Sequence, residues 1–330
     1  MQLRFVSSAV LALLMSVSMG FAQTEPPSAP SPQESGAPQA QQEPKLPPVS
    51  EANFTAAAPT RAEVNGFLKT SWGYDTNRIW EVFAVEKTAA PGVSKVTVLL
   101  AQKHNPQIAS LTFFVTPDGK HLITQDSVLD FGAHPYENNY RILQQRATGP
   151  YRGAAAKQFE LVEFADFECP HCKDAQATAE RLVQDFPQAR YVFENFPLVN
   201  VHPKAFEAAA YSVCVDQLGG NAAFFKFASA IFDAQAELAG QDPTQALRNA
   251  ATAAGQDPDK VTACAASPTA KAAVDASERL GQDLNVNETP TLFIDGRAVP
   301  MNAVPYDELK KIIAYQFSMD GAPAAGAAGR

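Results

Sequence analysis

Two cysteines stand at a spacing that suits redox chemistry. Cys169 and Cys172 belong to a Cys-Pro-His-Cys motif, and the two intervening residues allow the sulfur atoms to close a small, reducible disulfide ring. The residues before the motif, 158–167, form a mostly apolar run that predicts a buried central strand. We expect a helix to begin at the motif. Cys169 would then face the unpaired backbone N–H groups of a helix N-terminus, where the pKa of a thiol falls.

Apolar spacing predicts the helix that must hold this motif. Residues at i, i+4, i+7, i+8 and i+11 after the motif are Ala175, Ala179, Leu182, Val183 and Phe186. Pro187 ends the pattern, and a second strand is predicted over 190–196. Pro170 suits the first helical turn because its missing N–H needs no partner there. His171 adds a donor beside Cys169, and its protonated form should favour the thiolate and make the disulfide more oxidising.

A Cys-x-x-Cys motif can also belong to a zinc site or form a purely structural disulfide. A zinc site requires a second pair of ligands, but Cys214 and Cys264 lie fifty residues apart, and neither has a histidine or cysteine two to four positions away. A structural disulfide rarely uses so tight a loop at the start of a helix. The order of strand, motif and helix therefore favours redox chemistry, and we predict no metal site and no cofactor.

The composition limits the remaining function classes. The chain has 330 residues, 46% hydrophobic content and a net charge of −9, which predicts a globular protein with more than one domain. Its 26 basic residues are outnumbered by 35 acidic ones and form no run of five, so we expect no nucleic-acid partner. After the N-terminus no stretch of about 18 apolar residues occurs, so we predict no transmembrane anchor in the mature chain.

The first 22 residues have the three parts of a secretion signal. Arg4 supplies a short positive region, residues 5–15 form an apolar core, and the segment 20–22 (Gly-Phe-Ala) is a small-x-small site. The sequence therefore predicts a signal peptide over 1–22 that is cleaved after Ala22. A protein with such a signal is expected to be periplasmic or otherwise extracytoplasmic.

Two folded stretches are predicted between flexible ends. Residues 23–50 are rich in proline and glutamine and 321–330 in glycine and alanine, so we expect a disordered linker and a disordered tail. The folded stretches are 51–150, a small α+β domain, and 151–320, which contains the Cys-Pro-His-Cys motif. The first stretch has no cysteine and its histidines stand singly, so we expect no chemistry in it.

Helix and strand signals are clear in the first folded stretch. Thr60 and Glu63 have the spacing of a capping box, which predicts a helix that ends near Thr70. Strand-like alternation follows, and in its first run Val82 and Val85 are expected on opposite faces. The strand-like runs are 80–85, 96–100, 109–116 and 121–124, the last two joined by a Pro-Asp-Gly turn. A further helix, at 136–147, is predicted to link the two domains.

Three segments of the second folded stretch resemble one known family. The segment from Val162 to Cys172 is similar to the active-site strand and helix of DsbA-like thioredoxin-fold oxidoreductases. Asn287 to Gly296 resembles the cis-proline loop of that family, and His202 to Cys214 resembles the first helix of its inserted helical subdomain. The resemblance covers about 157–317. It implies an α/β thioredoxin fold with a helical insertion over about 203–281, and the small α+β domain with its antiparallel sheet precedes this fold.

The resemblance also implies roles for single residues. Cys169 is expected to be the nucleophile that forms a mixed disulfide with a substrate, and Cys172 the buried resolving cysteine. Pro290 is expected to be the cis-proline beside the disulfide, with Thr289 offering backbone groups to a bound substrate strand. Glu163 matches the buried acid that shuttles a proton to the resolving cysteine. The strand pattern by itself also allows Glu163 to face solvent.

The other two cysteines, Cys214 and Cys264, lie on predicted helices, and both are predicted to be buried. Four cysteines permit three pairings. In a secreted chain we favour 169–172 with 214–264, which agrees with those DsbA-like proteins that carry a second bridge in the helical subdomain. We predict that the 214–264 bridge is structural, and a redox relay between the two pairs remains the alternative.

The first folded stretch is similar, in element order, length and the turn within 114–120, to the N-terminal dimerisation domain of DsbC/DsbG-like isomerases. That resemblance implies a homodimer, whereas Cys-Pro-His-Cys is similar to the motif of an oxidase, so oxidase and isomerase or reductase both stay open. The implied partners are unfolded or misfolded secreted proteins and a membrane redox partner of the DsbB, VKOR or DsbD kind. Two other function classes also remain, namely a copper(I) site at the motif and a redox-inert scaffold.

Overall fold

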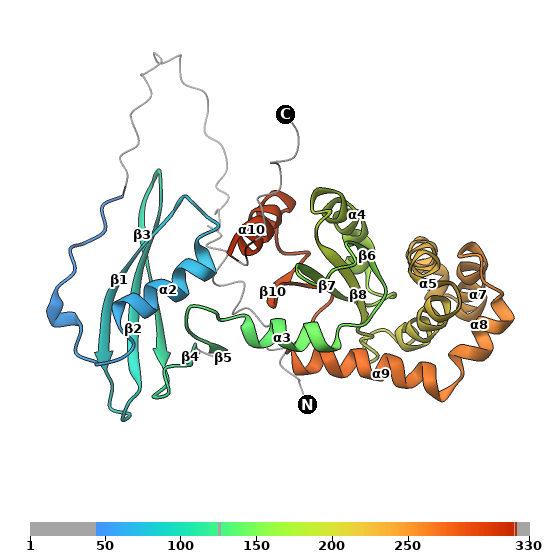
Figure 1. The fold of residues 1–330 in the computed structure, drawn as a ribbon, viewed down its shortest axis with the longest axis horizontal. Coiled ribbons are helices and arrows are strands. Elements are labelled where there is room, and N and C mark those ends of the chain that lie inside the picture. Colours follow the sequence, from blue (N-terminus) through green and yellow to red (C-terminus); the bar gives the residue numbers. More distant parts are fainter. Residues whose placement is uncertain (1–43, 125–126, 320, 322–330) are drawn as a thin grey trace, which may run out of the picture. The chain divides into compact units, whose positions relative to one another are not determined.

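The computed structural model describes residues 44–124, 127–319 and 321. The chain divides after Pro135 into two compact units, and each unit contains its own five-stranded sheet (Figure 1). The predicted signal peptide lies outside the described residues, as do all but 44–50 of the predicted linker and all but residue 321 of the predicted tail.

The first unit consists of an antiparallel sheet and the helix α2. Its strands are arranged in the order β1-β2-β3-β4-β5, and every neighbouring pair is antiparallel. The elements are η1 (Glu51–Asn53), α2 (Arg61–Trp72), β1 (Arg78–Lys87), β2 (Ser94–Gln102), β3 (Asn105–Val115), β4 (His121–Ile123) and β5 (Val128–Asp130). The apolar face of α2 packs on the sheet and closes the core of this unit.

α2 begins where the capping-box spacing predicts it. The backbone N–H of Thr60 donates to the Glu63 carboxylate (2.7 Å), and the backbone N–H of Glu63 donates to Oγ1 of Thr60 (3.2 Å). The bond from the Thr60 backbone to the carboxylate also holds the pKa of Glu63 below its ordinary value. The predicted helix is therefore confirmed, and it continues past Thr70 to Trp72.

A β-bulge changes the alternation of β1. Its pairing with β2 shifts between Val82 and Ala84, so Phe83 is inserted without a partner of its own. Val82 and Val85 are therefore both buried in the core of the first unit. The expectation that they lie on opposite faces is wrong, because one inserted residue reverses the face of every residue after it.

The second unit contains a mixed sheet in the order β10-β9-β7-β8-β6. β7 lies at its centre, parallel to β8 and antiparallel to β9, and the two outer pairs are antiparallel. The strands are β6 (Tyr151–Gly153), β7 (Glu160–Ala165), β8 (Arg190–Asn195), β9 (Thr291–Ile294) and β10 (Arg297–Pro300). Every residue of β7 is buried, so the buried central strand predicted before the cysteine motif is confirmed.

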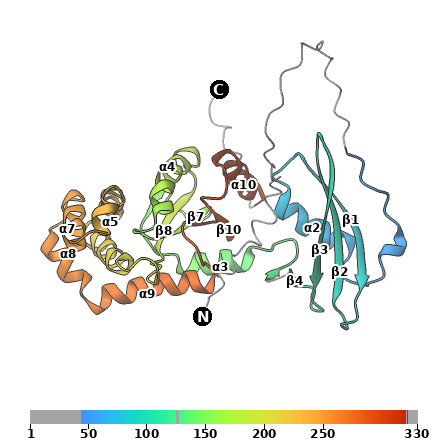
Figure 2. The same cartoon turned by 180° about the vertical axis from the view of Figure 1, so that it is seen from behind.

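The remaining elements of the second unit are helices. They are α3 (Glu137–Arg146), α4 (Pro170–Asp185), α5 (Ala205–Asp233), α6 (Gln235–Leu238), α7 (Pro243–Ala253), α8 (Pro258–Ala265), α9 (Pro268–Asp283) and α10 (Tyr306–Met319). Figures 1 and 2 show α3 and α9 on one side of the sheet, with α4 and α10 on the other.

Side chains along β7 reach both helical layers. Val162 packs with Leu143 of α3, whereas Cys172 of α4 shares a cluster with Phe193 of the neighbouring strand β8. Because successive side chains of a strand point to opposite faces, Glu163 lies on the face that α4 covers. The sheet therefore turns this carboxylate toward the helix that carries the cysteines.

α3 belongs to the second unit. The sequence predicts a helix over 136–147 as a linker, with a domain boundary near residue 150. Leu143 and Ala147 are instead buried in a cluster with β7 and β8, and the chain divides at Pro135. The helix is part of a core because its apolar side chains find partners on the sheet.

Five consecutive helices, α5 to α9, are inserted between β8 and β9. They span Ala205–Asp283, close to the predicted 203–281. Gly220, at a φ of 69°, interrupts the helical geometry of α5 and produces a kink there. The insertion shares a buried cluster with the cysteine pair, so it packs beside the Cys-Pro-His-Cys motif.

Candidate active site at the start of α4

Cys169 occupies the N-cap position of α4. β7 ends at Ala165, a short turn follows, and the carbonyl of Cys169 accepts a hydrogen bond from the backbone N–H of Cys172 (3.1 Å). Pro170 is the first helical residue, where its missing N–H leaves nothing unsatisfied. Cys169 is 5% exposed and Cys172 is 0% exposed, and both are free thiols in this structure. Pro170 and His171, which stand between the two cysteines in sequence, are exposed.

The two thiols differ in acidity. A hydrogen bond with the Cys172 side chain lowers the pKa of Cys169 to about 5, and Thr289 and the backbone N–H groups of Cys172 and His171 act in the same direction. Burial raises the pKa of Cys172 well above the ordinary value of a thiol. Cys169 is therefore the thiolate at neutral pH, while Cys172 keeps its proton.

We expect the ultraviolet absorbance of the Cys169 thiolate in the reduced protein to titrate with a midpoint at about pH 5. The lowered pKa means that the thiolate is present above this pH and is lost as the pH falls through it. At pH 7 about 99% of Cys169 is then ionised, against about 1% for a thiol with a pKa near 9. The Cys169→Ser variant supplies the baseline. A midpoint above about pH 8, close to that of a free thiol, contradicts the expectation.

The loop before β9 meets Cys169. The Thr289–Pro290 peptide bond is cis, and Sγ of Cys169 lies 3.4 Å from the carbonyl oxygen of Thr289, which can accept a hydrogen bond from Cys169 only while that cysteine is a thiol. Both loop residues are buried, and the carbonyl of Pro290 accepts a hydrogen bond from the backbone N–H of Met301 (3.1 Å). The fold thus brings together two predicted site segments that are 120 residues apart in sequence.

Glu163 lies in the interior beside this pair. Its side chain is 1% exposed, which excludes the solvent-facing alternative. Burial raises the pKa of Glu163 to about 7, an effect that the hydrogen bond from Tyr191 and the charge of Arg152 partly offset. The negative charge of Glu163 contributes to the raised pKa of Cys172. Ionisation of Glu163 therefore makes loss of the proton from Cys172 less favourable.

The site combines a cysteine pair at a helix start with a cis-proline loop and a buried acid. A family model described as Thioredoxin matches residues 145–314, just over half of the chain. The chain belongs to the thioredoxin family. The second unit has a thioredoxin fold with a helical insertion, and the small α+β unit with its antiparallel sheet precedes it, so the predicted fold class is confirmed.

Individual proteins show weaker similarity to this thioredoxin-family chain. ScsC from Proteus mirabilis, in a transitional conformation, is 19% identical, with 55% of this chain and 78% of that chain covered at a TM-score of 0.47. A periplasmic thioredoxin-like protein from Salmonella enterica serovar Typhimurium is 20% identical, with 55% and 97% covered at a TM-score of 0.46. The Na⁺/H⁺ antiporter NhaA 1 of Salinispora arenicola is 34% identical over 148 residues, which are 44% of this chain.

These similarities assign no activity to the chain, which spans only 21% of the length of that antiporter. Among the residues that the structure describes, no helix is long and apolar enough to cross a membrane. The same residues contain no group of three or more His, Cys, Asp or Glu side chains placed to hold a metal ion.

Asp166 organises the turn that precedes Cys169 in the thioredoxin fold. Its buried carboxylate accepts hydrogen bonds from the backbone N–H groups of Glu168 and Leu198 (both 2.8 Å) and lies 2.8 Å from Nδ1 of His202. Its own backbone N–H donates to Sγ of Cys172 (3.4 Å). By holding this turn in place, the Asp166 carboxylate positions the Asp166 backbone N–H that donates to Cys172. Sequence analysis missed Asp166, although its position directly after the buried strand is a usable signal.

The helical insertion of the thioredoxin fold also holds this turn. Gln235, at the start of α6, donates through Nε2 to the carbonyl oxygens of Phe167 (2.8 Å) and Cys169 (2.9 Å). These two bonds hold the backbone that carries Sγ of Cys169. Sequence analysis also missed Gln235, and no local pattern reveals it because its partners lie 68 and 66 residues away.

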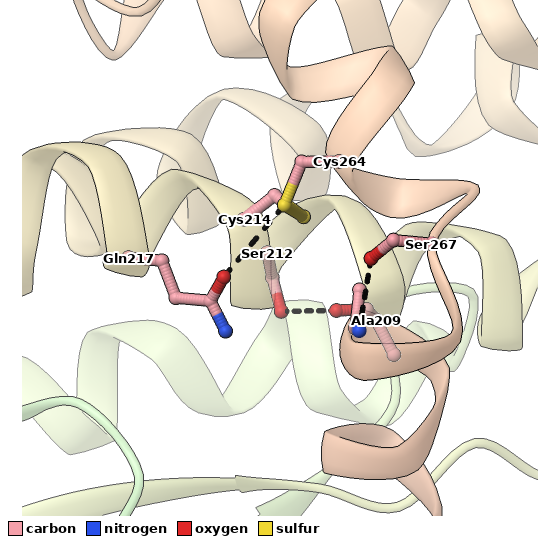
Figure 3. Close-up of a disulfide and its surroundings, with 7 residues drawn as sticks. Ala209, Ser212, Cys214, Gln217, Cys264 and Ser267 are labelled. Atoms are coloured by element: carbon pink, nitrogen blue, oxygen red, sulfur yellow. Dashed lines mark hydrogen bonds between the residues drawn. A yellow bond between two sulfur atoms is a disulfide. The ribbon is translucent and has the colours of Figure 1, made fainter.

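The remaining cysteines form a disulfide within the insertion. It joins Cys214 of α5 to Cys264 of α8, with 5.9 Å between their Cα atoms (Figure 3). Cys214 is fully buried, but Cys264 is only partly buried, so the expectation of burial is wrong for Cys264. Oε1 of Gln217 lies 3.7 Å from Sγ of Cys264, and we treat this as a contact because a disulfide sulfur carries no hydrogen.

Proposed function

We propose that the protein is an extracytoplasmic thiol–disulfide oxidoreductase that exchanges disulfides with protein substrates through Cys169. The observation that carries this proposal is the opposite shift of the two thiols, with the pKa of Cys169 lowered to about 5 and that of Cys172 raised. Exchange needs a thiolate that attacks and a second thiol nearby that resolves the mixed disulfide. The pair at the start of α4 supplies both.

The difference in acidity between Cys169 and Cys172 sets the order of steps when a substrate disulfide is reduced. The Cys169 thiolate attacks one sulfur of a substrate disulfide, and the other substrate sulfur leaves as a thiolate. Cys172 then gives its proton to the Glu163 carboxylate, and the Cys172 thiolate attacks Sγ of Cys169. The second substrate thiolate leaves, so the substrate ends as a dithiol and the protein as the Cys169–Cys172 disulfide. The same steps in reverse oxidise a substrate dithiol.

The backbone of Thr289 contributes to the proposed binding of substrate. Its carbonyl oxygen lies 3.4 Å from Sγ of Cys169, so backbone groups of the loop stand beside the reacting sulfur. A substrate strand that pairs with this backbone presents its own sulfur to Cys169 without reading the substrate sequence. Such recognition suits a protein that acts on many substrates.

The proposed location rests on the signal-peptide pattern of residues 1–22. The proposed substrates are unfolded or misfolded secreted proteins, and a membrane redox partner of the DsbB, VKOR or DsbD kind recycles the cysteine pair. A homodimer formed through the first unit belongs to the same proposal. Light scattering checks it, and a mass equal to one chain contradicts it.

Two assays test the proposed function and its direction. The oxidised protein is mixed with reduced, unfolded ribonuclease, and the reduced protein with ribonuclease that carries scrambled disulfides. Recovery of ribonuclease activity in the first assay alone indicates an oxidase, and recovery in the second indicates an isomerase. If neither assay exceeds the rate of the Cys169→Ser variant, the proposal is contradicted.

A further inference from the structure

Tyr191 is the hydrogen-bond partner of the buried acid. It lies on β8, which runs parallel to β7 with Tyr191 opposite Leu161 and Phe193 opposite Glu163. Tyr191 and Glu163 therefore lie two positions apart on the same face of the sheet, the face that α4 covers. The phenol hydroxyl donates to Oε2 of Glu163 (2.8 Å), and both residues are 1% exposed.

The two carboxylate oxygens of Glu163 are not equivalent. Oε2 accepts the bond from Tyr191, whereas Oε1 is buried and has no hydrogen-bond partner among the described residues. A buried oxygen without a partner is costly when the carboxylate is charged, so Oε1 is the atom that gains most from a proton. The tyrosine thereby selects which oxygen is free to react.

Three titratable or charged groups face Glu163 from the neighbouring elements. They are Cys172 on α4, Tyr191 on β8 and Arg152 on β6. The Arg152 guanidinium lies over the Tyr191 ring, 5.5 Å from its centroid. Burial raises the pKa of Tyr191 well above its ordinary value, so the hydroxyl keeps its proton and remains a donor at neutral pH.

We propose that Tyr191 is a positioning residue for proton transfer, whose hydroxyl fixes the Glu163 carboxylate through Oε2 and leaves Oε1 free to take the proton of Cys172. This inference rests on the proposed function. During resolution the Cys172 S–H bond breaks, the proton moves to Oε1, and the Cys172 thiolate attacks Sγ of Cys169. The bond between Cys169 and the substrate sulfur breaks, and the substrate leaves with the electron pair. The proton on Oε1 returns to solvent before the next cycle.

Removing the Tyr191 hydroxyl is expected to raise the pKa of Glu163. The bond from Tyr191 favours the charged form of Glu163, so its loss leaves both oxygens without a partner and raises the pKa of Glu163 further. Fewer carboxylates are then ready to accept a proton at neutral pH. We expect the midpoint of the pH profile for resolution to move up by about one pH unit in Tyr191→Phe, which makes resolution about tenfold slower below the midpoint.

The experiment loads Cys169 of the full chain with a small thiol as a mixed disulfide and follows closure of the Cys169–Cys172 disulfide from pH 5 to pH 9. Tyr211→Phe is the matched control, because Tyr211 is also buried and its hydroxyl lies 2.9 Å from Oγ1 of Thr262, within the helical insertion. We expect Tyr211→Phe to keep the wild-type midpoint. An infrared titration of the Glu163 carboxyl band, assigned by its loss in Glu163→Gln, should show the same upward shift in Tyr191→Phe.

Fluorotyrosine at position 191 keeps the shape of the side chain and tests whether the midpoint of the pH profile can also be moved down. Its more acidic hydroxyl is a stronger donor, so the midpoint should move down, which a purely structural role does not explain. An unchanged midpoint in both variants, or an equal shift in Tyr211→Phe, overturns the role of Tyr191. If the wild-type protein does not close the disulfide and accelerates neither ribonuclease assay, the proposed function itself fails, and this outcome is distinguishable from the first.

Discussion

Replacing Cys169 by serine is expected to abolish disulfide exchange, with a loss of about 10³-fold or more in the catalysed reduction of insulin. The serine hydroxyl is not ionised at neutral pH, whereas the pKa of Cys169 is lowered to about 5. In the variant, the Thr289 carbonyl and the Gln235 amide still surround position 169, but the serine hydroxyl there cannot attack a disulfide. Turnover by dithiothreitol-driven reduction of insulin measures the effect.

Cys172→Ser is the matched control for this variant. It keeps the Cys169 nucleophile, so the first attack on a substrate should proceed while resolution stops. A redox-inert scaffold predicts that both variants behave as the wild type. Residual turnover within about tenfold of wild type in Cys169→Ser contradicts the assignment of Cys169 as the nucleophile.

Removing the second disulfide is expected to lower the free energy of unfolding of the thioredoxin unit by about 4 kcal/mol. Cys214 and Cys264 are 50 residues apart in sequence, and a cross-link over a loop of that length strongly restricts the unfolded chain. Helical circular dichroism in a denaturant titration of Cys214→Ala/Cys264→Ala measures the change. Under a reductant that opens the bridge, the wild type should approach the variant.

The chain carries its own control for that measurement. Trp72 and Trp80 are its two tryptophans, and both lie in the first unit. Their fluorescence should therefore report a transition that the double substitution leaves in place. A change in unfolding free energy below about 1 kcal/mol contradicts a structural role for the bridge. Lost exchange activity in a stably folded double variant instead favours the redox relay.

Local patterns were sufficient where neighbouring residues decide the structure. The capping box of Thr60 and Glu63 positions α2 with two hydrogen bonds across three residues. The apolar run before Cys169 and the spaced apolar residues after it placed the cysteine at a helix start, because these residues supply the apolar side chains that are buried on both faces of β7 and on one face of α4. These local patterns were almost sufficient to predict the position of the cysteine pair at the centre of the site.

Features that depend on distant partners were not predictable in this way. The bulge at Phe83 arises from the pairing of two strands, and the three-residue strands β5 and β6 are too short to show an alternation. Tyr191 looks like an ordinary strand residue until its hydroxyl is seen on Glu163, 28 residues away. Asp166 likewise has its acceptor role only when the loop that carries His202 folds back on it.

Capture of substrates on Cys169 shows directly whether this cysteine exchanges disulfides with proteins. The Cys172→Ser variant is expressed with its signal sequence, free thiols are alkylated under acid, and mixed disulfides are identified by mass spectrometry. We expect secreted proteins bound through their cysteines to Cys169, and none bound in Cys172→Ser/Cys169→Ser. If the single variant captures no more than the double variant, Cys169 does not exchange disulfides with protein substrates, and the proposed function is wrong.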